Sequence, residues 1–591
     1  MNLTNPTGHW QVTRLGSTVY DNRWIVLDWD GTDGKFYDTD GAGTPFLTIT
    51  GCKYADVINV NGRIYISPLT DIGSPLTDAT YGFIHIYDGT TARLAGGVAP
   101  DLTAGPTTVI DTAVPGFGTP GMHLFAVLFE TDTGFLTPPP DPSTWINFTT
   151  AGSVFVQMDN IPLGPTECVA RIIIATRTIV SYDGIPENWE MFQAYRIADN
   201  TTTSQAWDLI DSGLVDSVDY LLDIYDRIPA CNRISTYGSR MMYNGPHTNS
   251  SLVIVSRPSD PETSSQGEDY LQKPDGSPED IYVGRELRVV YYIFKESSTW
   301  ATRETDGSAP NAWKIELIDS GIGCSPFGIG EVMANTGSLL LDNFLVVGLT
   351  GAYIFSGTYS KEPISRNIQP AFTDKTYISR IHVKYFRLVI DPVRRLFFIL
   401  LPIIDDNPAN NTYKLYVGNY FNGLTPDTVK WATWEETLGI NSVQVYSSPD
   451  QLYFPCLTIT YPDGTGVYYE LLQGAVTAIP APPWSYVTGY NSNPDGSLYT
   501  FATVRVRALG IPYGEEPPLT PATLNIGYGD LDSASITTTE QLTIVAKPGK
   551  YYTSLLNRVG EKIRISLSGS FYFMISKLVL FVSERAKDRQ R

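Results

Sequence analysis

Short runs of alternating hydrophobic and polar residues, broken by turn-forming pairs, recur along the chain. Alternation with a period of two is typical of half-buried β-strands. The clearest case is Val57–Val60 and Arg63–Ile66, which flank the pair Asn61-Gly62. Because Asn and Gly accept the positive φ angles of a tight turn, this stretch predicts two strands joined as a hairpin.

Asp-Gly pairs punctuate the chain in a similar way, since Asp and Gly also suit hairpin turns and loop tips. They lie beside strand-like runs at Asp88-Gly89, Asp183-Gly184, Asp275-Gly276, Asp306-Gly307, Asp463-Gly464 and Asp495-Gly496. Together these pairs predict a chain divided into many short strands.

One stretch, Trp207–Asp226, has apolar residues near a 3.6-residue period and is the best candidate for a helix. Gly213 lies inside it, and glycine is unfavourable in a helix interior. A helix and an irregular structure therefore both stay open here.

The composition agrees with a β-rich chain. Its 591 residues include 36 Tyr, 24 Phe, 11 Trp, 51 Gly and 41 Pro. Aromatic residues suit pleated sheets, while Gly and Pro favour turns. We therefore predict an all-β fold class, and the length predicts several domains.

The region 116–226 has the strand spacing of a small sandwich of two sheets. Its expected strands are His123–Glu130, Ser153–Met158, Val169–Arg177, Phe192–Ile197 and Thr203–Leu209. It resembles the fibronectin type III or immunoglobulin-like modules inserted into phage structural proteins, most clearly in Asn160–Pro165, Arg171–Arg177 and Ile197–Thr203.

Three further regions complete the predicted domain organisation. Region 1–115 is an N-terminal β region that contributes to a propeller or a platform. In 227–478, strand pairs repeat at irregular intervals, which predicts β-propeller blades, with a stacked sandwich as the alternative. After the stiff Pro-rich segment Ile479–Pro483, region 479–591 is predicted to hold the closing strands of a C-terminal β-sandwich.

Charge and hydropathy exclude two classes of protein. The chain has 41 Lys and Arg against 62 Asp and Glu, a formal net charge of −21, and no long basic stripe, so tight nucleic-acid binding is disfavoured. The longest apolar run, Leu396–Ile404, is far shorter than the about 18–20 residues that span a bilayer. The N-terminus lacks the apolar stretch of a secretory signal, so we expect folding in the cytoplasm and no stable membrane insertion.

Residues that commonly bind metals are scattered. The five Cys are too far apart for a zinc knuckle or a redox pair, which favours buried free thiols, and the five His form no pair at helical spacing. One acidic run, with Asp28, Asp30, Asp33, Asp38 and Asp40, has oxygen ligands at alternate positions as calcium loops do. It lacks the bidentate Glu of an EF-hand, and turn formation is the favoured interpretation, so no metal or cofactor is assigned.

The motifs of the common catalytic sites are absent from the sequence. The nearest approach to a nucleophile elbow, Gly323–Phe327, lacks the second Gly, and Ser181–Gly184 departs from the sialidase turn motif. No phosphate-binding Gly-rich loop occurs. A glycosidase on a propeller could still use carboxylates from distant loops. The adjacent candidates are Asp405, Asp406, Glu435 and Glu436, for which solvated loop charges are the alternative. No catalytic residue is assigned.

Four passages resemble the tail nozzle and tail stabilisation proteins of short-tailed bacteriophages. They are Tyr87–Pro100, Leu252–Glu262, Gly351–Gly357 leading to Pro363–Ile368, and Lys430–Trp434. Their order along one chain, between Tyr54 and Tyr469, carries the resemblance. It departs from closer relatives in the long insertion after the first passage and in the missing aromatic-proline-x-tryptophan run before the Asp-Pro-Glu loop.

The resemblance implies a structural virion protein of the tail, without enzyme activity, assembled in the host cytoplasm. It implies a ring, commonly a homohexamer, below the portal and the tail adaptor protein, with tail fibres or a spike as further partners. Genomic DNA would be retained behind this ring and pass through its lumen without specific binding. An acidic lumen would repel phosphates and prevent sticking.

Two other functions remain alternatives. A receptor-binding or fibre-attachment protein would use the sandwich module and exposed aromatic residues as an adhesive surface. A glycan-active propeller enzyme would use the carboxylates named above. The basic tail Arg585–Arg591 is either a docking segment for an acidic neighbour or a frayed, solubilising terminus.

Overall fold

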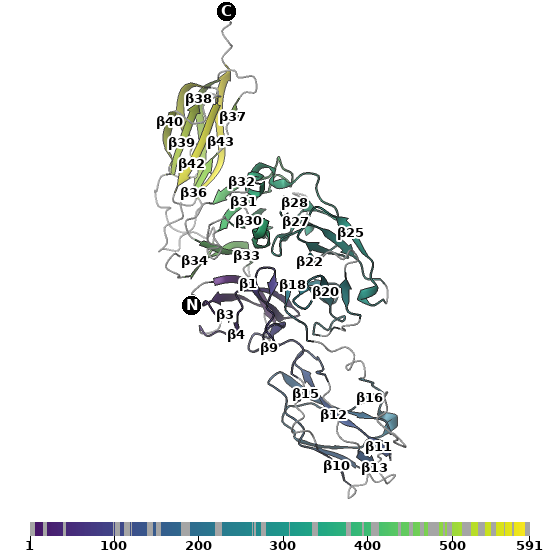
Figure 1. Cartoon of the computed structure of the whole chain (residues 1–591). Helices are drawn as coiled ribbons and strands as arrows, with labels where there is room; N and C mark the ends of the chain where they lie inside the picture. The colour runs from purple at the N-terminus through teal and green to yellow at the C-terminus, as the bar shows by residue number, and fades with distance from the viewer. Residues whose placement is uncertain are drawn as a thin grey trace, which may run out of the picture. The chain divides into compact units, whose positions relative to one another are not determined.

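The computed structural model describes most of the chain. The described residues are 6–15, 20–38, 43–98, 100, 107–111, 119, 121–138, 146–148, 155–178, 190–218, 227–262, 264, 268–272, 279–305, 308–333, 341–373, 380–392, 395–402, 413–434, 439–447, 453–460, 466–470, 484–487, 491–492, 499–510, 522–529, 538–544, 551–560, 562–569 and 573–584. They form an all-β protein of antiparallel sheets, as predicted (Figure 1).

The chain divides into two compact units, Trp10–Pro326 and Phe327–Arg591 together with Met1–His9. The division falls inside the range 227–478 that the sequence assigns to one set of blades. Each unit is described by itself below.

The first part of the chain forms two sheets. The first sheet has the order β1 (Pro6–Leu15), β2 (Tyr20–Trp29), β3 (Asp33–Asp38), β4 (Leu47–Thr50). The second has the order β5 (Tyr54–Val60), β6 (Arg63–Asp71), β8 (His85–Tyr87), β9 (Ala92–Leu94), with β7 (Ser74–Pro75) paired to β6.

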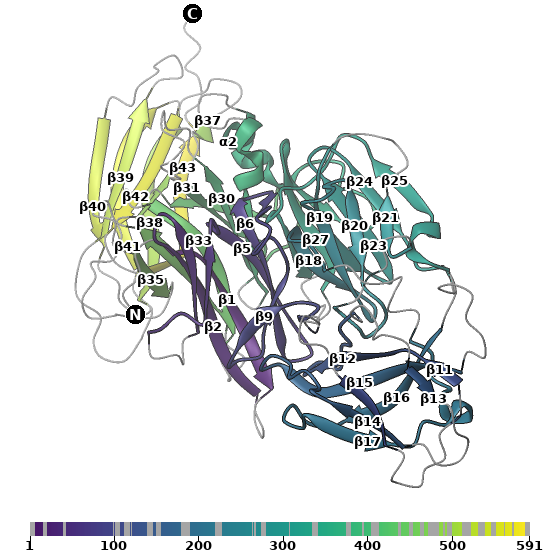
Figure 2. The same cartoon turned by 60° about the horizontal axis from the view of Figure 1, so that its bottom comes forward.

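An inserted module of eight strands follows β9. One sheet consists of β10 (Thr107–Asp111), β14 (Phe155–Asp159) and β17 (Ser204–Trp207), and another of β12 (Phe125–Thr131), β15 (Cys168–Thr176) and β16 (Met191–Ile197). The short strands β11 (Gly121–His123) and β13 (Ile146–Phe148) pair separately. A shared core that includes Phe125, Met158 and Trp207 joins the two larger sheets face to face (Figure 2).

The module contains all five strands that the sequence predicts for the region 116–226. It also contains β10, which lies in the range assigned to the N-terminal region, so its first sheet begins before residue 116. The candidate helix Trp207–Asp226 is wrong over its described residues, where Trp207 ends β17 and a single turn, η1 (Asp211–Gly213), follows. Its apolar residues fill the module core instead, as Trp207 and Leu214 do.

Two four-stranded sheets complete the first unit, each an up-and-down meander of consecutive strands. One is β18 (Cys231–Tyr237), β19 (Arg240–Pro246), β20 (Leu252–Val255), β21 (Tyr270–Gln272). The other is β22 (Ile281–Leu287), β23 (Val290–Lys295), β24 (Thr299–Thr302), β25 (Ile315–Asp319), with the turn η2 (Pro310–Ala312) before β25.

The second unit continues with three meanders in chain order. They are β26 (Ile329–Met333), β27 (Leu341–Gly348), β28 (Gly351–Phe355); then β29 (Arg387–Asp391), β30 (Leu396–Pro402), β31 (Tyr413–Asn419), β32 (Lys430–Trp434); then β33 (Gly439–Ser447), β34 (Tyr453–Thr460), β35 (Gly466–Glu470). The helical turns η3 (Ile364–Ile368), α2 (Pro370–Thr373) and η4 (Arg380–Tyr385) connect the first two. No helix among the described residues is long and apolar enough to cross a membrane.

The C-terminal strands form two sheets in which sequence neighbours are mostly not spatial neighbours. One has the order β36 (Trp484–Val487), β42 (Lys562–Gly569), β39 (Ala522–Gly529), β40 (Thr538–Ile544), with β37 (Asn491–Ser492) paired to β42. The other has the order β41 (Tyr551–Gly560), β38 (Tyr499–Gly510), β43 (Phe573–Glu584).

Successive meanders share cores in chain order. In the first unit, the β1–β4 sheet packs on the β5–β9 sheet through residues such as Leu27 and Ile66. Tyr65 of the β5–β9 sheet and Tyr243 of the β18–β21 sheet lie in one core between these two sheets. The β18–β21 sheet in turn packs on the β22–β25 sheet. In the second unit, β26–β28 and β29–β32 share one core. Burial of these faces is the main force that holds each sheet to the next.

Two hairpins use the same two-residue turn with very different residues. Asn61 and Gly62 have φ of +52° and +74°, which confirms the predicted hairpin between β5 and β6. The turn between β22 and β23 consists of Arg288 and Val289, with φ of +52° and +59°. A β-branched residue at positive φ is strained, because its Cβ lies too close to the following carbonyl oxygen.

The strain at Arg288 and Val289 predicts that a less strained turn would stabilise the protein. Replacing the turn with the favoured pair, as Arg288→Asn with Val289→Gly, should raise the free energy of unfolding by about 1 kcal/mol, since it relieves the strain of the turn. Denaturant unfolding followed by tryptophan fluorescence measures it, and Trp300 in the adjacent strands provides a nearby signal. A lower stability would show that Val289 is not strained.

Candidate functional site

Two of the passages that carry the family resemblance meet at a buried ion pair. Arg93 lies in β9, in the first passage, and Glu262 follows β20, at the end of the second. The guanidinium of Arg93 donates to both carboxylate oxygens of Glu262, each at 2.8 Å. The backbone N–H of Gly96 also donates to Glu262, at 2.7 Å, and the Glu262 side chain has no exposed surface.

The inserted module contributes the other half of this site. Asp132, in the turn after β12, accepts hydrogen bonds from Nε and Nη2 of Arg93 at 3.2 and 2.9 Å. The same carboxylate forms an ion pair with Arg63 of β6, at 2.7 Å. The hydroxyl of Thr133 donates to Glu262. We call these five residues, Arg63, Arg93, Asp132, Thr133 and Glu262, the Arg93 cluster.

Burial makes the Arg93 cluster electrostatically strong. Only 9% of the Arg93 side chain is exposed. This burial lowers the pKa of Arg93, but hydrogen bonds from the guanidinium to Glu262 and the charges of Glu262 and Asp132 outweigh it, so the pKa is raised overall. A planar guanidinium with five donors suits two carboxylates at once. The cluster therefore joins three separate chain segments through a single charged side chain.

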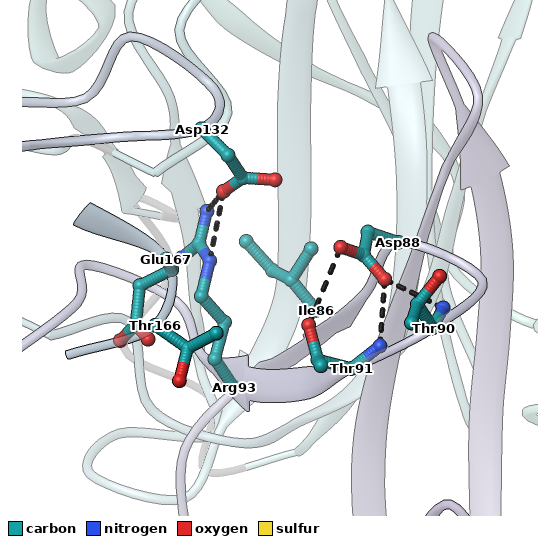
Figure 3. Close-up of a pocket in the computed structure, with 8 residues that line it drawn as sticks. All are labelled: Ile86, Asp88, Thr90, Thr91, Arg93, Asp132, Thr166 and Glu167. Atoms are coloured by element: carbon teal, nitrogen blue, oxygen red, sulfur yellow. Dashed lines mark hydrogen bonds and ion pairs between the residues drawn. The ribbon is translucent and has the colours of Figure 1, made fainter. Parts of the chain in front are cut away.

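A pocket of about 270 Å³ lies beside the cluster (Figure 3). It is lined by Ile86, Asp88, Thr90, Thr91, Arg93, Asp132, Thr166 and Glu167. The first five belong to β8, β9 and the turn between them, and the last three belong to the inserted module. The pocket thus lies between the β5–β9 sheet and the module, and three carboxylates line it.

The turn between β8 and β9 forms one wall of the pocket. The carboxylate of Asp88 accepts hydrogen bonds from the backbone N–H groups of Thr90 and Thr91 at 2.6 and 2.7 Å, and Gly89 has φ of +95°. This confirms Asp88-Gly89 as a hairpin tip. The other five Asp-Gly pairs lie outside the described residues.

The remaining two passages of the resemblance also meet, in the second unit. The indole N–H of Trp431, in β32, donates to the backbone oxygen of Ile364 in η3, at 3.3 Å. The hydroxyl of Ser365 accepts from the N–H of Ala352 at 3.0 Å. Gly351 has φ of +144°, and a Cβ there would lie 2.7 Å from the Ser365 oxygen, so this close approach requires glycine.

The acidic run at Asp28–Asp40 forms a hairpin turn. Oδ1 of Asp30 accepts from the N–H groups of Thr32 and Asp33 at 2.9 and 2.8 Å, and Asp30 pairs with Lys35 at 2.7 Å. The hydrogen bond from Lys35 and those from the backbone lower the pKa of Asp30 to about 2.

The other acidic side chains of the run differ in their surroundings, and Oδ1 of Asp33 is buried without a hydrogen-bond partner among the described residues. The hydroxyl of Tyr87 donates to Asp38 at 3.0 Å, and Asp28 lies in β2 and is buried. Asp40 lies outside the described residues. Within the described part of the chain, no group of three or more His, Cys, Asp or Glu side chains could hold a metal ion.

Other predicted residues have mixed outcomes. Four of the five Cys are free and buried, as expected: Cys52, Cys168, Cys231 and Cys324. Ser325, in the segment nearest to a nucleophile elbow, is buried completely. Several other predicted residues lie outside the described part of the chain. They are the carboxylates Asp405, Asp406, Glu435 and Glu436, the segment Ser181–Gly184 and the basic tail.

Comparisons with known proteins identify no family for this chain. No protein-family model matches the chain, and no curated protein matches it. A solved structure described as a 6-phosphogluconolactonase from Bacteroides uniformis is 9% identical, with a TM-score of 0.26, and the match covers 59% of this chain and 96% of that one.

A second solved structure, the NanB sialidase from Streptococcus pneumoniae, is also 9% identical, with a TM-score of 0.26, over 77% of this chain and 83% of the sialidase. An exo-β-1,3-galactanase from Phanerochaete chrysosporium is 10% identical with a TM-score of 0.22, over 59% and 95% of the two chains. At such TM-scores, these similarities support no assignment of fold or activity.

Removal of one charge tests the Arg93 cluster. Glu262→Gln should lower the free energy of unfolding by about 2–4 kcal/mol, because a buried guanidinium loses its best partner. The matched control is Glu316→Gln, whose ion pair with Lys314 is exposed to solvent, so its loss should change the stability far less. Denaturant unfolding measures both variants. Equal losses would mean that the cluster contributes no more than a surface ion pair.

Acid sensitivity tests the burial of His85 in β8. Burial lowers the pKa of His85 to about 4, from about 6.5 in the unfolded chain. Between these values the unfolded chain binds more protons, so stability should fall as the pH falls from 6.5 to 4, by about 3 kcal/mol in total. His85→Gln should remove this component from a plot of unfolding free energy against pH. A variant with the wild-type slope would contradict the prediction.

Proposed function

We propose that this chain is a structural virion protein of a phage tail, the subunit of a nozzle ring below the portal and the adaptor. One observation carries the proposal. The four passages that resemble the nozzle and stabilisation proteins are joined in two pairs, through Arg93 with Glu262 and through Trp431 with Ile364. The passages that carry the resemblance thus contact each other in two pairs.

The architecture supports a propeller as the scaffold. Up-and-down sheets of consecutive strands that pack face to face in chain order are typical of propeller blades. We infer that the sheets from β5 to β35, apart from the module, are such blades. The module of β10–β17 would be the fibronectin type III-like insertion, and β36–β43 would form the C-terminal sandwich.

A ring subunit that encloses DNA under pressure needs a rigid scaffold rather than a catalytic site. Buried faces between sheets and ion pairs such as Arg233 with Asp56, at 2.7 Å, connect adjacent sheets in this way. The net charge of −21 would repel DNA phosphates from the lumen. Partners in this proposal are further copies of the chain, the adaptor, the portal and a fibre or spike.

A receptor-binding or fibre-attachment protein is the second candidate, favoured by apolar exposure on the module. Of the eight large hydrophobic side chains exposed among the described residues, four lie there. They are Leu163, Val169, Ile210 and Val215, with 55%, 45%, 40% and 67% of their surface exposed. Such residues suit a surface that binds another protein.

Copy number separates these functions. Quantitative mass spectrometry of purified particles, against the portal taken as the twelve copies that the family resemblance implies, should give about six copies of this chain. A different multiple of three would favour a fibre or spike. Absence from the particle would contradict a virion role and favour a glycan-active enzyme.

A further inference from the structure

The inserted module has apolar cores of its own. The described residues of one core, among them Phe125 and Val156, all belong to the module, and so do those of a second core with Leu128 and Ile174. The core between the β5–β9 and β18–β21 sheets, which includes Tyr65, is built from residues outside the module. We call these two sheets the adjoining sheets. Hydrophobic burial thus stabilises the module and the adjoining sheets separately.

One turn of the module makes polar contacts with the adjoining sheets. The carboxylate of Asp132 accepts from Arg93 at 3.2 and 2.9 Å and pairs with Arg63 at 2.7 Å. The backbone oxygen of Asp132 also accepts from Arg63, at 3.1 Å, and the hydroxyl of Thr133 donates to Glu262. Domains of one chain generally move relative to each other unless their interface is large and hydrophobic. Polar contacts between separate cores are therefore typical of a module that can move.

On the side of the adjoining sheets, the pairing of Arg93 is complete without the module. Its guanidinium donates to both carboxylate oxygens of Glu262, each at 2.8 Å, and Gly96 donates to the same carboxylate at 2.7 Å. All three residues belong to the adjoining sheets or to the loops next to them. If the module moved away, the buried carboxylate of Glu262 would keep these partners, and the charge of Arg93 would stay neutralised.

On the side of the module, the turn that carries Asp132 is held by its own backbone. The N–H of Thr131 donates to the oxygen of Phe135 at 2.8 Å, and the N–H of Gly134 donates to the oxygen of Thr131 at 2.9 Å. The side chains of Asp132 and its partner Arg63 are 20% and 28% exposed. Water can therefore reach both charges, and separation would hydrate them rather than bury them without a partner.

The chain enters the module through two glycines that follow β9. Gly96 and Gly97 have φ of +82° and +60°, a backbone region that glycine adopts without strain. Gly96 is bound to Glu262 on the side of the adjoining sheets. A Cβ at Gly97 would lie 3.1 and 3.2 Å from the methyl groups of Thr131 and Thr137 of the module. Hinges are short segments that absorb changes in φ and ψ, so Gly97 is suited to be the pivot.

Charges around the pocket oppose the contact. Asp88, in the turn between β8 and β9, and Glu167, in the module, both line it. Carboxylates on the two sides of one pocket repel each other. The attraction of Arg63 and Arg93 for Asp132 acts against this repulsion, so the free-energy difference between contact and separation is smaller than the ion pairs alone would give.

We propose that the contacts of Asp132 control the position of the module. In a docked state, Asp132 is bound to Arg63 and Arg93. In a released state, the module turns about Gly97 as a rigid body, with its own cores intact, and the two walls of the pocket separate. The inference goes beyond the proposed function and does not rest on it, because it concerns a movement within a single subunit.

A distance measurement on the full-length chain tests the movement. Spin labels are attached at Val215→Cys in the module and at Val289→Cys in the β22–β23 turn, because these side chains are 67% and 73% exposed. Four of the native Cys are buried, and the fifth is removed as Cys456→Ser. Pulsed electron paramagnetic resonance then gives the distribution of distances between the labels.

Two changes of one residue should release the module to different extents. Asp132→Asn should raise the ratio of released to docked molecules about tenfold, because charged hydrogen bonds to two arginines are lost together. Asp132→Lys should release most molecules, since a cation then faces Arg63 and Arg93. The matched control is Glu130→Gln, in the adjacent strand, whose partner Arg196 lies within the module, and it should keep the wild-type distances.

Salt gives an independent readout. Raising the ionic strength from about 0.1 to about 1 M shortens the screening length from about 10 to about 3 Å, so it should increase the released fraction of the wild type. Denaturant unfolding of each labelled variant shows that it is folded. A folded Asp132→Lys variant with the wild-type distances, or an equal change in Glu130→Gln, would overturn the proposal. Either result leaves the proposed function standing, because the copy number in the particle does not depend on this movement.

Discussion

The buried pairing of Arg93 with Glu262 and Asp132 is the constraint on which the first unit depends. One guanidinium connects the β5–β9 sheet, the loop after β20 and the inserted module through its two carboxylate partners. Removal of Glu262 takes a fully buried partner from Arg93, which costs more than the loss of an exposed ion pair.

Local chemistry made much of the fold predictable. Asn61-Gly62 and Asp88-Gly89 form the expected turns, because their residues accept the required φ angles regardless of context. The alternating strands of the module are also where the sequence places them. Of the two interpretations left open for Trp207–Asp226, the helix is wrong over the described residues, because apolar residues spaced near a helical period fill the core of a sandwich instead. Periodicity over so short a segment does not say which partner buries each residue.

The candidate site could not be predicted, for two physical reasons. Arg93 and Glu262 are 169 residues apart, and no local pattern relates an ion pair across that distance. Arg288 and Val289 form a turn that their residue types disfavour, so the sequence carries no turn signal there. Local rules fail most often where a residue serves something other than the folding of its own segment.

In the proposed function, sheets with buried faces, a module held by the Arg93 cluster and a net charge of −21 would suit a subunit that forms the wall of a channel. The central claim is that copies of this chain close into a ring in the phage tail. Cryo-electron microscopy of the tail, reconstructed without imposed symmetry, tests it most directly. We predict six copies in a closed ring below the portal and adaptor. A trimeric spike, or no density for the chain, would contradict it.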